Sequence, residues 1–561
     1  MRVKAQLKVG YVVAAIGAAL LVATALTAFL VAAPPPQSAN FYLTILHTND
    51  VHAHYGGFTA DGKICYASIC RGGYGGSLRL KRAIDSIKGH DPDALLVDAG
   101  DQFMGSLFWS LYKEKAATTV MNAIGYQFFV PGNNDFIGGL SSFQGLIEGL
   151  KAKVISSNFQ IKDNKISLNN LFPYIVIEIN NRKVGLIGLT LPDSDEFRAF
   201  LDEIDDQPFE LVDEVETLQN LVQKLTNEGV DVIVAITHLG LERDIKLAEA
   251  VKGVDIIVGG HTHQVLGKIL PNSAGPYPIV VDSPNSEPVL VVTAGSRGLY
   301  LGRLTVNFDA KGRATSWSGE TLSLDAKTLS RIKAPPEDEN LKKYLDQLSV
   351  PIKSLSQETI GQIVSAGRER VLDVNPRACR LRECRSGDAL TSALLASSPG
   401  AQIALVNGGT VRNSLPVGPV SKADVLSAFP FDDYVCRAKI SGEELIRVLE
   451  RSVAELGIGT SGRFFQVAGL RVTYAGRPGE WRVNGIQIQD GDSFRPLDLA
   501  AKYELVSLDF LANGGDGYKS LKKLNWQMTN LRLTEVFINY LKKGPLMVDF
   551  EPRITFISKN P

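Results

Sequence analysis

The sequence predicts a protein of two domains, the first an α/β domain and the second a mixture of helices and strands. Its 561 residues exceed what one hydrophobic core commonly organises. The composition, 45% hydrophobic and 21% charged, is that of a globular protein. From residue 41 to about 310, apolar strand-like runs alternate with helix-like segments, which is typical of an α/β sheet.

The first domain is expected at residues 41–333, with its elements in alternation. Strands are expected at 42–47, 94–98, 130, 154–157, 174–179, 184–189, 230–237 and 254–258. Helices are expected at 75–87, 107–124, 139–151, 213–229 and 245–251.

The boundary between the domains is marked by a change to proline and acidic residues at 334–340, followed by a charged helix at 339–348. We therefore expect a linker helix within 334–355 and a second domain at 356–557.

The N-terminal segment 1–40 has the pattern of an export signal. Arg2, Lys4 and Lys8 precede residues 9–33, which carry no charge. This apolar run is long enough to span a bilayer, so cleavage as a signal peptide and retention as a membrane anchor both remain open. In either case the rest of the chain is expected to be secreted or on the extracellular face of the membrane.

The cysteines fit an oxidising compartment. Cys65/Cys70 and Cys379/Cys384 form two close pairs, whereas Cys436 lies in a strand-like run and is expected to be a buried thiol. A zinc site made of all four paired cysteines is the alternative. The net charge of −1 gives no support to a nucleic-acid partner.

Histidine, carboxylate and amide side chains recur where the predicted strands end. Since ligands of α/β sheets bind at the carboxyl ends of strands, these side chains are expected to share one cleft. Mixed imidazole and oxygen donors suit a pair of divalent metals, which would activate a hydroxide and clamp a phosphoryl group. The candidate ligands are Asp50, His52, Asp101, Asn133, His238, His261 and His263.

Three stretches carry a specific resemblance: 43–52, ending in Asn49-Asp50-Val51-His52, then Asp98-Ala99-Gly100-Asp101-Gln102, and Gly259-Gly260-His261-Thr262-His263. They resemble the metallophosphatase domain of the secreted 5′-nucleotidase family, which includes related apyrases, and the similarity extends over about 42–552. It implies a four-layer α/β metallophosphatase domain, a linker helix that acts as a hinge, and an α+β nucleotide-binding domain. It also implies AMP, ADP or ATP as partner and matches the seven candidate ligands to metal positions. The mixed oxygen and imidazole donors suit two divalent ions of zinc, manganese or iron better than calcium, with zinc favoured and manganese the alternative. A disulfide between Cys65 and Cys70 is implied too, and the oligomeric state is left open, a homodimer included.

One block departs from the family pattern. Where the family has a histidine and, three positions later, an aspartate as catalytic dyad, this chain has Asn134 and Ile137. General acid–base help is worth about 10²–10⁴-fold, so we expect slow hydrolysis of monophosphates and a shift towards phosphoanhydrides. Asn134 and Asp101 remain the candidate catalytic residues, with Asn134 able to donate a hydrogen bond to a phosphoryl oxygen. His54 is either a substitute acid or, as we favour, a solvated loop histidine.

The second domain carries a candidate nucleotide pocket. Arginines match phosphate oxygens, aromatic rings stack on bases, and an aspartate suits ribose hydroxyls, although each phenylalanine alone also fits a core position. The resemblance matches the following residues to substrate contacts: Arg380, Asn407, Arg412, Phe431, Phe510 and Asp516.

Three functions are compatible with the sequence. The metal ligands favour an extracellular nucleotide phosphohydrolase of 5′-nucleotidase or apyrase type. Asn134 and Ile137 favour a non-catalytic nucleotide-binding protein on the same scaffold. A phosphodiesterase or nuclease is less favoured, since the chain has no excess of positive charge for a polyanion.

Overall fold

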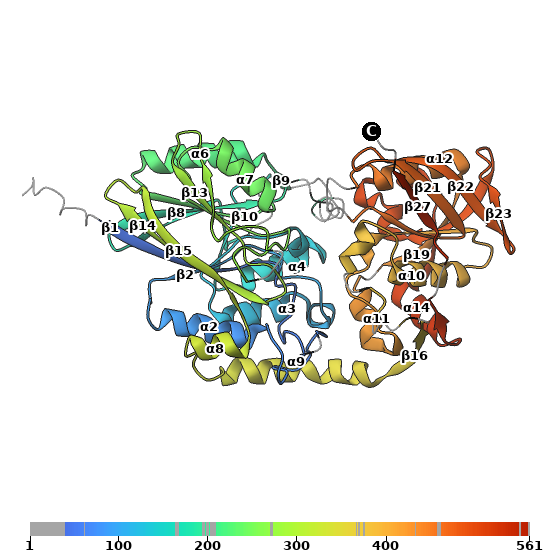
Figure 1. Ribbon diagram of the computed structural model, residues 1–561, viewed down its shortest axis with the longest axis horizontal. Coiled ribbons are helices and arrows are strands. Elements are labelled where there is room, and N and C mark those ends of the chain that lie inside the picture. Colours follow the sequence, from blue (N-terminus) through green and yellow to red (C-terminus); the bar gives the residue numbers. More distant parts are fainter. Residues whose placement is uncertain are drawn as a thin grey trace, which may run out of the picture.

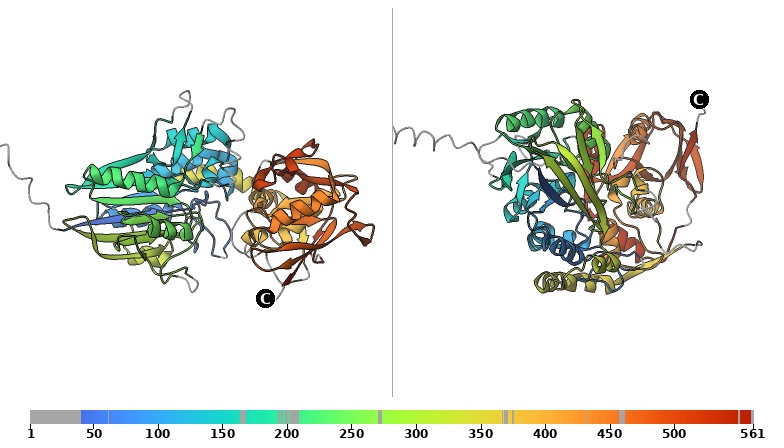
Figure 2. Two further views of the ribbon diagram at one scale, coloured as in Figure 1. Left: turned by 90° about the horizontal axis from the view of Figure 1, so that it is seen from above. Right: turned by 60° about the vertical axis from the view of Figure 1, so that its left-hand side comes forward.

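The computed structural model describes residues 40–558, with gaps at 61, 163–167, 193, 195–196, 198–200, 202–208, 270–272, 366, 368–370, 374–375, 432, 457–461 and 549–550. The described chain forms two bodies that lie side by side, the first coloured blue to yellow-green and the second orange to red (Figures 1 and 2). The predicted export segment at 1–40 lies outside the described residues, apart from residue 40. Among the helices described, none is long and apolar enough to cross a membrane.

The N-terminal body is built around two stacked sheets. Within the described residues, one sheet has the strand order β15-β14-β1-β2-β3-β4-β6 and the other β12-β13-β11-β10-β8-β7. The first comprises β15 (Ala314–Ser323), β14 (Tyr300–Asp309), β1 (Asn40–Thr48), β2 (Leu95–Asp98), β3 (Phe128–Phe129), β4 (Lys153–Ile155) and β6 (Leu171–Phe172). The second comprises β12 (Ile279–Asp282), β13 (Pro288–Val292), β11 (Ile256–Gly259), β10 (Val232–His238), β8 (Arg182–Thr190) and β7 (Tyr174–Ile179). A further short pair joins β5 (Phe159–Ile161) to β9 (Phe209–Leu211).

Helices cover the outer faces of both sheets, which gives four layers (Figure 1). One outer layer has α6 (Glu214–Asn227) and α7 (Leu241–Ala250). The other has α2 (Ser77–Lys88), α3 (Leu107–Ile124), α4 (Gly139–Gly149) and α8 (Ala326–Arg331). The predicted α/β class and four-layer architecture are therefore confirmed, and helix α7 begins four residues before its predicted start at 245.

Strand β10 shows why the central strands read as continuous apolar runs. Val232, Val234 and Ile236 face the core between the two sheets. Ile233 and Ala235 face the core beneath α6 and α7. Because successive side chains point to opposite faces, a strand covered on both sides must be apolar throughout.

Helix α9 (Glu339–Gln357) runs beneath both bodies (Figure 1). Asp338 caps its N-terminus by accepting a hydrogen bond from the backbone N–H of Leu341. The helix continues through Pro351, beyond the charged stretch at 339–348 that the sequence highlighted.

The C-terminal body has a separate α+β architecture. In its described parts the sheets have the orders β20-β17-β24-β19-β25, β18-β16-β26 and β23-β22-β21-β27. The strands are β16 (Thr359–Val364), β17 (Ile403–Asn407), β18 (Gly418–Ser421), β19 (Tyr434–Ser441), β20 (Phe465–Ala468), β21 (Leu470–Gly476), β22 (Arg482–Asp490), β23 (Ser493–Pro496), β24 (Lys502–Leu508), β25 (Gln527–Arg532), β26 (Leu546–Met547) and β27 (Ile554–Ser558). The helices are α10 (Arg385–Ala396), α11 (Lys422–Ala428), α12 (Gly442–Val453), α13 (Asp509–Ala512) and α14 (Leu533–Leu541).

Both predicted cysteine pairs are disulfides, Cys65–Cys70 and Cys379–Cys384, which excludes the four-cysteine zinc site. Cys436 is a free, buried thiol on β19, as predicted.

Candidate functional site: a metal centre facing a nucleotide pocket

The seven candidate ligands come from strand ends of both stacked sheets. In the first sheet β1, β2 and β3 run parallel, so their carboxyl ends meet at one edge. In the second, β10 and β11 do the same. His238 is the last residue of β10 rather than one beyond it, and the other ligands follow their strands in loops.

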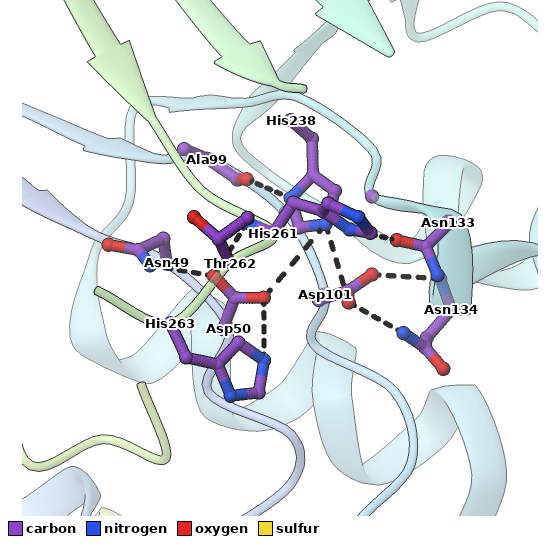
Figure 3. A network of polar contacts seen from close by, with 12 residues as sticks. Asn49, Asp50, Ala99, Asp101, Asn133, Asn134, His238, His261, Thr262 and His263 are labelled. Atoms are coloured by element: carbon purple, nitrogen blue, oxygen red, sulfur yellow. Dashed lines mark hydrogen bonds and ion pairs between the residues drawn. The ribbon is translucent and has the colours of Figure 1, made fainter. Parts of the chain in front are cut away.

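Two overlapping groups of donor atoms lie at the centre (Figure 3). Asp50, His52 and His263 form one group, and Asp50, Asp101 and His238 form the other. Within each group the donor atoms lie within 4.8 Å of one another. Asp50 is common to both groups and therefore joins them.

Asp101 also reaches both groups. Its Oδ2 atom is 3.3 Å from Nε2 of His238 and 3.7 Å from Nε2 of His52. This position suits a carboxylate that lies between two cations. On the far side of His238, Nδ1 of His261 hydrogen-bonds Oδ1 of Asn133 over 2.9 Å, so all seven predicted ligands gather in one region.

The donor set fits divalent cations. Oδ1 of Asp50 and Nε2 of His238 are buried and have no hydrogen-bond partner in the described structure. The Nδ1 atoms of His52 and His238 donate to the carbonyl oxygens of Phe103 (2.9 Å) and Ala99 (2.6 Å), which leaves both Nε2 atoms facing the centre. Burial lowers the pKa of His52 to about 4, so its imidazole is neutral and able to act as a ligand near pH 7.

The ligand loops adopt a backbone that L-residues rarely occupy. Asp50, His52, Asp101, His261 and His263 all have φ between 49° and 77°. Residues held in this left-handed region cluster at functional sites, where the surrounding structure enforces them. Space beside these loops is tight: a Cβ atom on Gly132, three residues after β3, would lie 2.3 Å from Oδ1 of Asp101.

Two supporting residues escaped the sequence analysis. Asp135 accepts hydrogen bonds from the backbone N–H groups of Gly132, Asp101, Gln102 and Phe103, and so ties the ligand loops together. Asn49 donates to Oδ2 of Asp50 over 2.7 Å. Asn49 stands inside a motif that the sequence analysis quotes and Asp135 directly follows Asn134, so attention to short polar residues near each ligand could have assigned them a role.

Asn134 lies in the 3-10 helix η1 (Asn133–Phe136) and holds Asp101. Its backbone N–H donates to Oδ1 of Asp101 over 2.8 Å, and its Nδ2 donates to Oδ2 over 2.6 Å. At least one amide hydrogen thus serves the carboxylate rather than a phosphoryl oxygen. Ile137 lines the cavity that adjoins Asn134 and packs against the core, so no carboxylate stands behind Asn134 at that position.

His54 is not a solvated loop residue, and the favoured prediction for it was wrong. It is 2% exposed, lines the cavity beside His52, and hydrogen-bonds the carbonyl oxygen of Val51 through Nδ1. Its ring stacks on Phe58 with 5.1 Å between centroids. The loop buries it because the 52–58 segment folds back against the core instead of facing solvent.

The metal centre opens into a cavity of about 1080 Å³ whose opposite wall belongs to the C-terminal body. Every residue predicted to contact the nucleotide lines it: Arg380, Asn407, Arg412, Phe431, Phe510 and Asp516. A volume of this size accommodates a small organic ligand such as a nucleotide.

The wall that the C-terminal body contributes, called the nucleotide wall because the predicted nucleotide contacts lie on it, is organised by tight turns. Nδ2 of Asn407 donates to Oδ2 of Asp516 over 2.6 Å, which fixes the aspartate against β17. Arg412 lies over the ring of Phe431, 5.0 Å from its centroid. At Gly408 a Cβ atom would lie 1.9 Å from the carbonyl oxygen of Cys379, so only glycine lets this turn approach the disulfide loop that carries Arg380.

Family comparisons agree with this geometry. The model of calcineurin-like phosphoesterases matches residues 43–265, and the model of the 5′-nucleotidase C-terminal domain matches residues 360–523. A snake venom 5′-nucleotidase of Naja atra is 32% identical over 548 residues, which cover 92% of this chain and 99% of that protein. The chain belongs to the 5′-nucleotidase family.

Human 5′-nucleotidase is 32% identical over 516 residues, covering 87% of this chain and 86% of the human protein. Among solved structures, the 5′-nucleotidase precursor of Thermus thermophilus superposes with a TM-score of 0.82 at 33% identity, covering 93% of this chain and all of that one. The protein is thus a phosphoesterase homologous to metal-dependent 5′-nucleotidases, with the binuclear type of site that calcineurin-like phosphoesterases have.

Proposed function

We propose that this protein hydrolyses nucleotide phosphates outside the cell, slowly for nucleoside monophosphates and relatively faster for ADP or ATP. The observation that carries the proposal is the 132–137 loop, which keeps Asn133 beside His261 but presents Asn134 and Ile137 where the family has its dyad. The two disulfides and the apolar N-terminal run support an extracellular location.

The metal centre would hold two divalent cations, zinc or manganese, through the seven candidate ligands. Such cations polarise a phosphoryl group and lower the pKa of an attacking water. The roles of Asn134 are different. It orients Asp101 through two hydrogen bonds, and its amide can donate hydrogen bonds but is not acidic enough to transfer a proton to a leaving group.

The leaving group then decides which substrate suffers most. A ribose alkoxide is a strong base and needs a proton as it departs, so loss of the acid costs about 10²–10⁴-fold on AMP. A phosphate that leaves from an anhydride is a much weaker base and needs less help. The wall with Arg380, Arg412, Phe431 and Phe510 supports binding of either kind of nucleotide.

Phosphate release from AMP, ADP and ATP by the purified protein, with zinc or manganese added, tests the proposal. We expect a higher turnover number with ADP than with AMP. The double variant Asn134→His, Ile137→Asp should gain at least about 10²-fold on AMP, because it restores an imidazole with an orienting carboxylate. Comparable wild-type turnover on AMP and ADP, with AMP at about 1–10³ s⁻¹, would contradict the proposal.

Two controls sharpen this experiment. Ile137→Asp alone should give no gain, because a carboxylate without an imidazole has nothing to orient. Asn484→His, on an exposed position of β22, should leave turnover unchanged. If neither wild type nor double variant releases phosphate while nucleotides still bind, the second candidate function, a non-catalytic nucleotide-binding protein, is the correct one; the features that favour it are Asn134 and Ile137.

A further inference from the structure

Arg297 lines the cavity but belongs neither to the candidate metal ligands nor to the predicted nucleotide contacts. It follows β13, which runs parallel to β11 in the second sheet. The loop after β11 carries His261 and His263, so Arg297 reaches the same edge of the sheet by the same topological rule. Its side chain lines the cavity, on the wall that bears His52 and His54.

The backbone of Arg297 is held firmly against the metal loop. Its N–H donates to the carbonyl oxygen of Asp50 over 2.6 Å. Upstream, Asn49 accepts from the N–H of Ala294 over 2.9 Å and donates to the carbonyl oxygen of Gly295 over 2.6 Å. Arg297 itself has φ 59°, a left-handed conformation that is unfavourable for an arginine and that these contacts enforce.

The guanidinium of Arg297 makes no hydrogen bond or ion pair with any residue that the structure describes. Two other arginines of the cavity have carboxylate neighbours: Nε of Arg243 lies 2.5 Å from Oε1 of Glu214, and Arg463 pairs with Glu455. Burial lowers the pKa of Arg297. The pKa of His54 is lowered mainly by burial and, to a smaller extent, by the positive charge of Arg297. A partly buried cation without a counter-ion carries an unfavourable desolvation that an anionic ligand would relieve.

We propose that Arg297 is a further substrate-binding residue, whose guanidinium holds the phosphoryl group of the nucleotide against the metal centre. This inference rests on the proposed function only in taking a nucleotide phosphate as the ligand. The backbone of Arg297 is fixed to the loop of Asp50, whereas Arg380 and Arg412 approach from the C-terminal body. Arg297 therefore supplies positive charge on the wall that lacks the imidazole of the family dyad. It stabilises charge on phosphoryl oxygens and transfers no proton.

Calorimetric binding to the zinc-loaded full-length protein tests this role with two ligands. The α,β-methylene analogue of ADP resists hydrolysis and carries phosphoryl groups, and adenosine shares its base and ribose without any charge. We expect Arg297→Ala to weaken binding of the analogue by about 10–100-fold, the usual size for a hydrogen bond to a charged group, and to leave adenosine unchanged. Arg297→Lys should recover part of the loss, because it keeps the charge without the bidentate fork.

The matched control is Arg303→Ala, which removes an arginine of the same domain that pairs with Glu320 on the surface and lies outside the cavity. It should change neither affinity. If Arg297→Ala weakens both ligands alike, or neither, Arg297 serves only the structure of its loop and the inference is wrong. If the wild type binds neither ligand, the nucleotide function itself fails, which is a different result. Steady-state kinetics give a second readout: equal losses on AMP and ADP support contact with the transferred group, and a loss confined to ADP overturns it.

Discussion

The two walls of the cavity differ in how far their charged and aromatic side chains are buried. The metal wall is the side of the cavity that carries the candidate metal ligands. Its central side chains are almost fully buried, with Asp50 and His238 at 0% exposure and Asp101 at 1%. Asp50 and Asp101 have left-handed backbone conformations, and buried hydrogen bonds that Asn49 donates and Asp135 accepts hold the surrounding loops. On the nucleotide wall Phe510, Arg380 and Arg412 are only partly buried, although Asn407 and Asp516 between them are buried.

The site is therefore expected to be rigid on the metal wall and adaptable on the nucleotide wall. A metal pair needs donor atoms fixed within tenths of an ångström, which buried and strained loops provide. A nucleotide must enter and leave, so half-exposed aromatic and arginine side chains are suited to the other wall. We therefore expect substitutions on the metal wall to have the larger effects.

The largest effect is expected for Asp101→Asn. The carboxylate lies within 3.7 Å of two imidazole nitrogens and accepts two hydrogen bonds from Asn134. An amide of the same shape loses the charge that balances the cations. Since even outer partners of metal ligands are worth about 10–100-fold in affinity or activity, the loss of turnover should be at least about 100-fold. Metal content per chain and phosphate release measure it together.

The control for this variant is Asp282→Asn, which neutralises an exposed carboxylate on β12 of the same domain. It should leave both readouts unchanged. Full zinc content and near-normal turnover in Asp101→Asn would show that Asp50 alone joins the two donor groups.

The metal wall was also the more predictable wall from sequence. Apolar runs such as 230–237 identified the strands, and polar residues placed directly after them could only gather at one sheet edge. The nucleotide wall needed the family resemblance, because Phe431 and Phe510 look like core residues until the turns around them are known.

What sequence could not show were contacts between residues distant in the chain. Nothing in the sequence around Asp135 indicates that its carboxylate accepts four backbone hydrogen bonds, or that Asn134 is turned towards Asp101. His54 was misjudged because the burial of a loop depends on the packing of its surroundings. Arg297 lies 34 residues beyond the last predicted ligand, and only the parallel pairing of β11 with β13 brings it to the cavity.

A smaller effect is expected on the nucleotide wall from Phe510→Ala. The ring of Phe510 lies against Gly515, where a Cβ atom would come within 2.5 Å of it, so one face is supported by backbone. Loss of one base stack costs about 1–3 kcal/mol, or roughly 5–150-fold in KM, with little change in kcat. Steady-state kinetics on ADP measure this split. Phe494→Ala on β23, remote from the cavity, is the control; a fall in kcat at constant KM would place Phe510 in the chemistry instead.

The joint between the two walls is held by hydrogen bonds from Asn413. Its Nδ2 atom lies 3.0 Å from the carbonyl oxygen of Gly105 in the metal-bearing body and 3.0 Å from that of Ser427 in its own. Tyr66 adds a second link by donating to Oγ of Ser427 over 3.3 Å. Gly105 itself is packed so closely that a Cβ atom there would lie 2.8 Å from the carbonyl oxygen of His52. Asn413 thus connects the turn after Arg412 to Gly105, which packs against the backbone of His52.

The smallest effect is therefore expected for Asn413→Ala. Its loss should lower kcat/KM by about 2–12-fold, the value of one net hydrogen bond, and increase the radius of gyration in X-ray scattering as the bodies separate. Asn484→Ala, exposed on β22, should change neither quantity. An unchanged radius with lowered kcat/KM would instead assign Asn413 to the placement of Arg412 alone, and the two walls would then be aligned by α9 and its packing rather than by this contact.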